Sequence, residues 1–224
     1  MIYPNGFGSI FRVNSFGESH GVGIGVVVDG CPAGLKLDLD FIQSELDRRK
    51  PGQSKLVSPR KEEDKVEVYS GLFEGITTGM PLMLMVLNGD AKSKDYSDIK
   101  DLFRPGHADY TYFAKYGYRD YRGGGRSSAR ETIGRVIAGA IAKQLLSHLG
   151  VSIRGGLVQV GNVLAKQLEW DQVEANDARF LDSSLLPDVE AEIKEARLAR
   201  DSVGAVIQME AYGVPVGLGD PAFA

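Results

Sequence analysis

Residues 128–150 read "SARETIGRVIAGAIAKQLLSHLG" and predict a long helix around which the rest of the chain can be arranged. Apolar side chains recur at helical spacing, and Ser128 with Glu131 forms the S-x-x-E pattern of a capping box. Gly150 ends the pattern. We expect a helix buried between layers, because its other faces carry small side chains that allow close approach. These are Ala129, Gly134, Ala138, Gly139 and Ala142.

The segments on both sides of this helix show strand and helix patterns in turn. β-Branched and alternating apolar runs predict strands at 21–30, 65–71, 81–90, 153–164 and 203–211. Amphipathic spacing predicts helices at 38–50 and about 186–200, the first capped by Asp38 and ended by Pro51-Gly52. We therefore predict a single domain over residues 1–224 of mixed α/β (α+β) class, with sheets packed around central helices.

Composition narrows the class of protein. The 224 residues are 43% hydrophobic, which is enough for a substantial core, and no stretch approaches the roughly 20 apolar residues of a membrane span. The start "MIYPNGFGSIFRV" lacks the layout of a signal peptide, so we expect a cytoplasmic protein without a membrane partner. The net charge is −4, which argues against nucleic acid as a partner. Cys31 is the only cysteine, so neither an intrachain disulfide nor a structural metal is expected.

The loop before the long helix, "RDYRGGGRSSARET" at 119–132, suggests an anion site. Three consecutive glycines let backbone N–H groups converge, and the helix that follows offers a positive dipole end. Charge and hydroxyl donors come from Arg119, Arg122, Arg126, Arg130, Ser127 and Ser128. The alternative is a solvated loop that only caps the helix, although capping does not require four arginines. The loop matches neither common nucleotide-binding glycine motif.

Two of the three histidines lie in predicted loops. His20 stands in "FGESHG" at 16–21, and His107 follows "RPG" and precedes the aromatic run "YTYF" with Tyr116 nearby. Histidine titrates near neutrality, so both could donate protons beside a phosphate, although a structural role for each is an equal alternative. The aromatic residues could wall a planar ligand, but packing in the core is the simpler interpretation. His148 reads as a cation at a helix C-terminus.

A basic segment, "LDRRKPGQSKLVSPRKEEDK" at 46–65, surrounds a Pro-Gly turn. Such a run is usually a solvated face. Together with the glycine-arginine loop, it could instead complete a basic pocket for a substrate with several negative charges.

Three segments taken together resemble chorismate synthase. They are "FGESHG", "DRRKPGQS" at 47–54 and "SKDYSDIKDLFRPGHADYTYFAKYGYRDYRGGGRSSARET" at 93–132, in this order. The third segment is specific to that family, and the similarity runs on to "GVPVGLGDP" at 213–221. The resemblance implies a β-α-β sandwich fold and a homotetramer in the complete enzyme. It also implies the chemistry: anti-1,4-elimination of phosphate from 5-enolpyruvylshikimate 3-phosphate to give chorismate, assisted by reduced FMN. The flavin would be reduced either by the enzyme with NADPH or by an outside reductant.

The resemblance also implies roles for individual residues. His107 corresponds to the histidine that protonates reduced flavin, and His20 to the one that assists the departing phosphate. Flavin contacts are implied for Ser19, Arg126, Ser127 and Ser128. Contacts with the phosphate and carboxylates of the substrate, or with NADP, are implied for Arg48, Arg49, Lys55 and Arg130. Lys55 stands where the family often has arginine, which keeps the charge but loses the bidentate fork.

Family members continue beyond "GVPVGLGDP", and that part supplies further flavin contacts, a substrate arginine and an aspartate near the flavin. We therefore expect a truncated domain that is incomplete at its C-terminus. This leaves two interpretations of the chain: the enzyme itself, or a flavin- and anion-binding fragment without turnover of its own. A nucleic-acid module is a distant third interpretation, because the overall balance is acidic.

Overall fold

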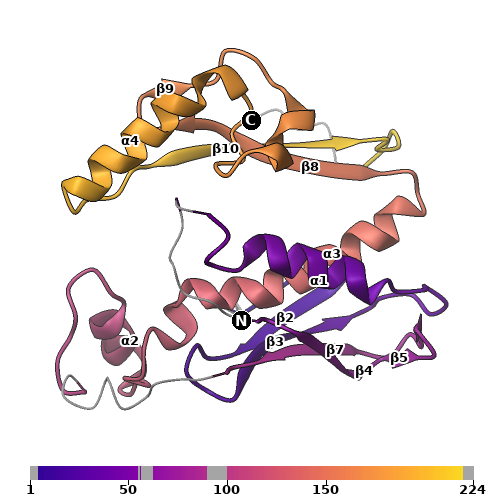
Figure 1. Cartoon of the computed structure of the whole chain (residues 1–224). Coiled ribbons are helices and arrows are strands. Elements are labelled where there is room, and N and C mark those ends of the chain that lie inside the picture. The colour runs from indigo at the N-terminus through magenta and orange to yellow at the C-terminus, as the bar shows by residue number, and fades with distance from the viewer. Residues whose placement is uncertain (1–4, 55, 57–62, 90–99, 219–224) are drawn as a thin grey trace. The chain divides into compact units, whose positions relative to one another are not determined.

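The computed structural model describes residues 5–54, 56, 63–89 and 100–218 (Figure 1). They form two compact units. Unit 1 comprises Met1–Lys50 and Glu62–Leu145, and unit 2 comprises Pro51–Lys61 and Leu146–Ala224. Each unit has its own sheet and its own core, and the single domain over 1–224 stays a prediction.

Unit 1 is built on a five-stranded antiparallel sheet with the strand order β1-β2-β3-β7-β4. The strands predicted at 21–30, 65–71 and 81–90 are β3, β4 and β7, respectively. They are neighbours in the sheet, in the order β3-β7-β4. A small hairpin of β5 and β6 follows β4 along the chain. The bounds are β1 Gly6–Phe7, β2 Arg12–Gly17, β3 Gly23–Asp29, β4 Val66–Ser70, β5 Leu72–Phe73, β6 Ile76–Thr77 and β7 Leu82–Leu87.

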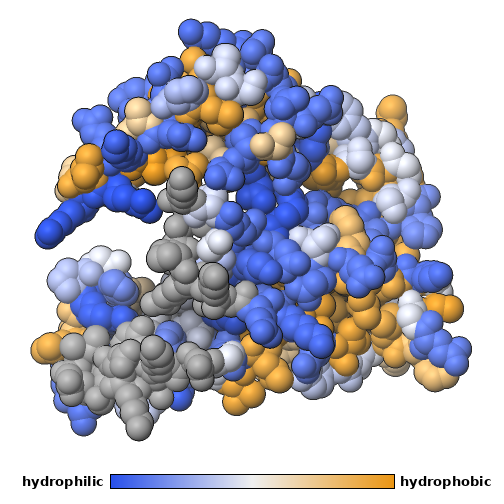
Figure 2. All heavy atoms as spheres, viewed as in Figure 1, coloured by the Kyte–Doolittle hydropathy of each residue, from blue (hydrophilic) through white to orange (hydrophobic). Residues whose placement is uncertain are grey.

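Two helices, α1 (Leu39–Arg49) and α3 (Thr132–Ser147), lie on the same side of this sheet in Figure 1. Side chains alternate along a strand, so every second residue of β3 and β7 faces the helices and is fully buried. The shared core contains Ile24, Val26, Val28, Leu82, Leu84, Val86, Ile42, Leu46, Ile133, Ile137 and Ile141. Figure 2 shows apolar residues on the surface of unit 1 as well, where β4, β5 and β7 lie. Phe73, 69% exposed, is one of them.

The start of α3 differs from the capping-box prediction. Two short 3-10 helices, Gly125–Ser127 and Ala129–Glu131, precede α3, which begins at Thr132. The Ser128 side chain caps the second of them by accepting from the Arg130 backbone N–H at 3.3 Å. The Glu131 carboxylate does not reach back to Ser128; it accepts from the Ser15 hydroxyl at 2.7 Å. The Glu131 half of the predicted capping box is therefore wrong, because a residue of β2 takes that carboxylate.

Of the two glycines in α3, Gly134 allows the helix to approach the sheet closely, and Gly139 has no such contact. A Cβ at Gly134 would lie 2.7 Å from the Gly25 carbonyl oxygen of β3 and 3.1 Å from the Ser15 Cβ. The helix backbone therefore lies directly against the sheet at Gly134. Gly139 faces away, and a Cβ there would meet nothing within 4 Å. Tight packing was also expected at Gly139, and among the described residues of this unit that expectation is wrong.

Unit 2 contains a three-stranded antiparallel sheet with the order β10-β8-β9. The strand predicted at 153–164 is a hairpin of β8 (Ser152–Val160) and β9 (Val163–Leu164), and β10 is Ala205–Tyr212. The predicted second amphipathic helix is α4 (Leu186–Leu198). Its Val189 packs with Val160 and Phe180 in a separate small core.

Sequence patterns missed two elements that matter for the site, β2 and α2 (Asp109–Tyr116). β2 contains Asn14, Ser15 and Gly17, which weaken its strand pattern. Only Asp109 of α2 is buried, so the helix lacks an apolar stripe that a periodicity search could detect. No helix in the described ranges has the length and apolar character needed to span a bilayer.

Candidate functional site

The loop after β2 and the glycine-arginine loop meet in space, although about a hundred residues separate them in the sequence. The Ser19 backbone N–H donates to the Gly125 carbonyl oxygen at 3.4 Å, and the Ser19 hydroxyl lies 3.0 Å from Nδ1 of His20. The His20 ring rests on Gly123, where a Cβ would lie 2.3 Å from both Cε1 and Nδ1 of the imidazole. Gly123 also has a φ of 66°, which favours glycine. The His20 ring thus packs directly against the first glycine of the loop, where any side chain would displace it.

The four arginines of the loop all have carboxylate partners. The shortest distances are 3.7 Å for Arg119 to Asp109, 2.6 Å for Arg122 to Asp120, 3.2 Å for Arg126 to Glu131 and 2.8 Å for Arg130 to Asp64. Much of the positive charge of the loop is therefore compensated within the protein. Within the described residues, pairs of arginines share a carboxylate at Glu131, which Arg126 and Arg135 both contact, and in two further clusters.

One such cluster joins Arg130 to the end of α1. The Asp64 carboxylate accepts from Arg49 at 2.9 Å and from Arg130 at 2.8 Å, and its side chain is 0% exposed. The structure thus brings Arg49 of the basic 46–65 segment next to the glycine-arginine loop. Two guanidinium groups that converge on one carboxylate offer planar, charged donors of the kind that suits an anionic ligand.

Arg48, the preceding residue of that segment, has different partners. Arg48 pairs at 3.0 Å with Glu45 of its own helix, and Glu45 also accepts from Lys143 of α3 at 2.9 Å. Lys55, implied as a substrate contact, lies outside the described residues.

A second shared carboxylate stands at the start of α2. Asp109 accepts from the Arg104 side chain at 2.8 and 2.9 Å and from the Arg104 backbone N–H at 3.1 Å. The Arg104 hydrogen bond lowers the pKa of Asp109 to about 2. Arg104 also donates to the Gly123 carbonyl oxygen at 2.7 Å, so it braces the glycine on which His20 rests. Arg119 supplies the second guanidinium of this cluster.

His107 is exposed just before α2. Its Nδ1 donates to the Pro105 carbonyl oxygen at 3.0 Å, which places a proton on Nδ1. The neighbouring aromatic residues are not core, as the simpler interpretation had it, because Tyr110 is 63% and Tyr116 54% exposed. Among the residues of their helix, Asp109 is the buried one. Tyr112 is half-buried and lines the hollow described next.

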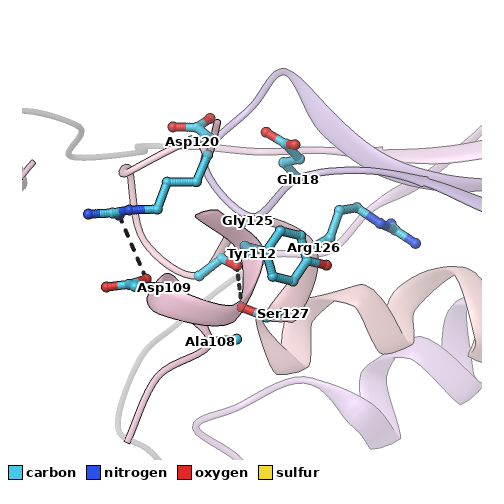
Figure 3. A pocket seen from close by; sticks show the side chains of 10 residues that line it. Glu18, Ala108, Asp109, Tyr112, Asp120, Gly125, Arg126 and Ser127 are labelled. Carbon is cyan, nitrogen blue, oxygen red and sulfur yellow. Dashed lines mark hydrogen bonds and ion pairs between the residues drawn. The ribbon is translucent and has the colours of Figure 1, made fainter. Parts of the chain in front are cut away.

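A surface hollow lies between the two loops and α2 (Figure 3). Its walls include Glu18, Asp109, Tyr112, Asp120, Arg126 and Ser127. The pKa of Glu18 is raised, first by burial and then by its side-chain hydrogen bond to Asp120. The pKa of Asp120 is lowered, first by its side-chain hydrogen bond to Arg122.

The implied flavin contacts are distributed unevenly around this hollow. The Arg126 side chain extends away from the other labelled side chains in Figure 3. Its guanidinium donates to the Ser15 hydroxyl at 2.7 Å and the Gly17 carbonyl oxygen at 3.0 Å, which ties the loop to β2. The Ser127 hydroxyl donates to the Gly124 carbonyl oxygen at 2.6 Å. Ser127 and the backbone of the loop therefore face the hollow, whereas the Arg126 guanidinium holds the loop against β2.

Several residues of the site were not singled out from the sequence as site residues, among them Asp64, Asn88 and Asp109. Asn88 donates to the carbonyl oxygens of Glu18 at 2.9 Å and Gly21 at 2.8 Å and accepts from Arg130 Nε at 2.8 Å. It therefore holds the His20 loop and Arg130 together. The only sequence signal was its place among turn residues after a predicted strand. Asp64 lies in a charged run whose pattern suggests a solvated face.

The fold and the site define an α/β protein with a loop-built site suited to anionic ligands. Residues 11–224 match the family model described as chorismate synthase. The chain belongs to the chorismate synthase family. The α/β fold class of chorismate synthase type is thereby confirmed, since a solved structure titled "Crystal Structure of Chorismate Synthase" matches with a TM-score of 0.74 and 28% identity over 95% of this chain.

Comparison with curated relatives supports the same family assignment. The chain is 53% identical over 219 residues to a chorismate synthase of Sulfurovum sp. (strain NBC37-1) and 52% identical over 223 residues to one of Methanocella arvoryzae. Each alignment covers 98% of this chain, but 61% and 60% of those relatives. The solved structure is covered to 60%. The chain thus spans about three fifths of the length of the proteins it matches.

Proposed function

We propose that this chain carries the substrate- and flavin-binding site of a lyase of the shikimate pathway. The reaction is the anti-1,4-elimination of phosphate from 5-enolpyruvylshikimate 3-phosphate, which gives chorismate. The observation that supports this most directly is the family match together with the cluster of Arg49, Asp64 and Arg130, which gathers two guanidinium groups beside the glycine-arginine loop.

The residues present fit reduced FMN and a substrate with several negative charges. Two clusters, each of two arginines on one aspartate, flank the loop that seats His20. Gly125 has a φ of 54° and no atom within 4 Å of the place where its Cβ would be, so a ligand can approach its backbone. When bound, reduced FMN supplies the electron density that assists cleavage of the C–O bond, while the net reaction is redox-neutral.

The residues of the chain bind anions and hold protons. Arg130, Arg49 and the adjacent Arg48 contact the phosphate and carboxylates of the substrate, and Lys55 extends this set. Ser19, Ser127, Ser128 and the backbone at Arg126 contact the flavin.

The two histidines handle protons. His20 donates a proton toward the departing phosphate from Nε2, because Ser19 takes Nδ1. His107 keeps the reduced flavin in its protonation state through its own Nε2. Both roles need a group that titrates near neutral pH.

We also propose that the complete protein is a cytoplasmic homotetramer that acts on this small molecule and binds no nucleic acid. NADPH is a candidate reductant for the flavin. The runner-up function is a flavin- and anion-binding fragment without turnover, since the relatives contain a further two fifths of their length.

Ligand titration followed by an anaerobic turnover assay separates the two functions. We expect saturable binding of FMN and of 5-enolpyruvylshikimate 3-phosphate, and binding without chorismate formation would favour the runner-up. In a version of the protein that spans the full length of its relatives, His20→Ala and His107→Ala should each lower turnover by roughly 10²–10⁴-fold with little change in affinity. His148→Ala is the control and should keep turnover. Near-normal turnover in both loop variants would remove the proton-donor roles.

A further inference from the structure

Asp64 is the most completely buried charged group beside the site. Its side chain is 0% exposed, and its two oxygens are divided between two arginines from different elements. Oδ2 accepts from Arg49 Nη2 at 2.9 Å, and Oδ1 accepts from Arg130 Nη1 at 2.8 Å. Each guanidinium group thus binds its own carboxylate oxygen. The Asp64 side chain therefore sets the distance between the guanidinium groups of Arg49 and Arg130.

The backbone holds Asp64 in a conformation that is uncommon for residues other than glycine, although aspartate tolerates it better than most. Its φ is 49°, in the left-handed region. Gln43 of α1 clamps this turn, because its Nε2 donates to the Asp64 carbonyl oxygen at 3.1 Å and its Oε1 accepts from the Val66 backbone N–H at 3.0 Å. A left-handed non-glycine residue persists only where its surroundings enforce it, and such residues cluster at functional sites.

The two arginines are held from other sides as well. Arg130 Nε donates to Asn88 at 2.8 Å, and Arg49 Nη1 lies 3.4 Å from the Thr132 hydroxyl at the start of α3. Their side chains are only 11% and 13% exposed. Long arginine side chains normally lose rotamer freedom when they bind a ligand, and fixing them beforehand removes that cost from binding.

We propose that Asp64 is a positioning residue that presents Arg49 and Arg130 as one fixed pair to a multiply charged anion of the substrate. The inference rests on the proposed function for the identity of that anion. Asp64 does not contact the ligand; it acts through the two guanidinium groups.

The direction in which Asp64→Asn changes anion affinity separates the positioning role from two simpler roles, charge neutralisation and fold stabilisation. If Asp64 only neutralised charge, Asp64→Asn would leave the arginine pair more positive and tighten anion binding. If Asp64 only stabilised the fold, the variant would melt earlier with unchanged affinity. A positioning role predicts weaker binding, because the asparagine amide accepts from one arginine and repels the N–H groups of the other.

The test measures the affinity of the chain for 5-enolpyruvylshikimate 3-phosphate by calorimetry. We expect Asp64→Asn to raise the dissociation constant by about 10- to 100-fold, the loss of one charge-assisted contact. Asp182→Asn is the matched control. Asp182 is 1% exposed in unit 2 and accepts from the backbone of Lys166 and from Ser184, with no arginine among these partners. It should lose stability and keep the wild-type affinity. Tighter or unchanged binding in Asp64→Asn would overturn the proposal.

A second measurement needs no ligand. The guanidinium ¹H–¹⁵N signals of Arg49 and Arg130, assigned with Arg→Lys variants, should be resolved in the wild-type chain and broadened by Asp64→Asn. If they stay sharp, Asp64 does not position the pair, even if the wild type binds no substrate and the proposed function fails. Should Asp64→Asn not fold, Asp64→Gly removes the carboxylate and relieves the left-handed strain, and the same spectrum is recorded.

Discussion

Replacing Gly123 with alanine should displace the His20 imidazole and leave the rest of the fold in place. A new Cβ would lie 2.3 Å from Cε1 and Nδ1 of the ring, whereas nonbonded carbon atoms rest about 3.5–4.0 Å apart. The ring must therefore move by more than about 1 Å, which separates its Nδ1 from the Ser19 hydroxyl. A shift of this size in a catalytic group can cost about 10²-fold in rate.

The backbone cost of this substitution must be separated from the steric effect. Gly123 has a φ of 66°, so alanine there costs about 1–2 kcal/mol of stability by conformation alone. Gly117 is the matched control, because its φ is 72° and a Cβ would meet nothing within 4 Å. Gly117→Ala should show the same loss of stability with His20 undisturbed.

The assay is the imidazole NMR spectrum of the chain, which contains three histidines. Gly123→Ala should shift the ring signals of His20 and leave those of His107 and His148 in place. Gly117→Ala should leave the His20 signals unchanged. A folded Gly123→Ala protein with wild-type His20 signals would refute the contact between this glycine and the ring.

Three further predictions concern packing, acid stability and the loop. Gly134→Leu should destabilise unit 1 by at least about 1–3 kcal/mol, because its side chain would meet the β3 backbone, whereas Gly139→Leu should change the melting temperature little; equal melting would contradict the helix placement. The pKa of Asp109 is lowered from 3.8 to about 2, so its stabilisation is present above about pH 4 and lost as the pH falls toward 2. Asp109→Asn should therefore lose about 2 kcal/mol at neutral pH and converge with wild type in acid unfolding measurements; a constant difference would argue against the ion pair. Arg126→Ala should cost about 1–3 kcal/mol in chemical denaturation and exposed Arg122→Ala less than about 1 kcal/mol; the reverse order would be inconsistent with the loop contacts.

Much of the fold could be predicted because its strands and helices follow simple periodicities. The buried residues of β3 and β7 alternate, and those of α1 and α3 recur at helical spacing. α2 could not be found in this way, because it exposes its aromatic residues and buries only Asp109. The capping box failed for a different reason. Glu131 finds a tertiary partner in Ser15, and no local pattern can show a contact between residues 116 positions apart.

The sequence indicated which residue types form the site, but it did not indicate which residues contact one another there. Glycines, arginines and histidines in loops indicated an anion site, and the structure places His20 against Gly123 and Arg49 beside Arg130. The pairings of Arg119 with Asp109 and of Arg130 with Asp64 could not be predicted, because those two carboxylates lie in other segments of the sequence.

The affinity of the chain for 5-enolpyruvylshikimate 3-phosphate, measured by calorimetry with FMN present, tests the central claim most directly. Wild type should bind one equivalent in a saturable titration, and Arg130→Ala should weaken binding by about 1.5–3 kcal/mol, the loss of a charge-assisted contact. Arg197→Ala, on α4 in unit 2, should leave the affinity unchanged. No saturable binding by wild type, or equal affinities of wild type and Arg130→Ala, would contradict the account.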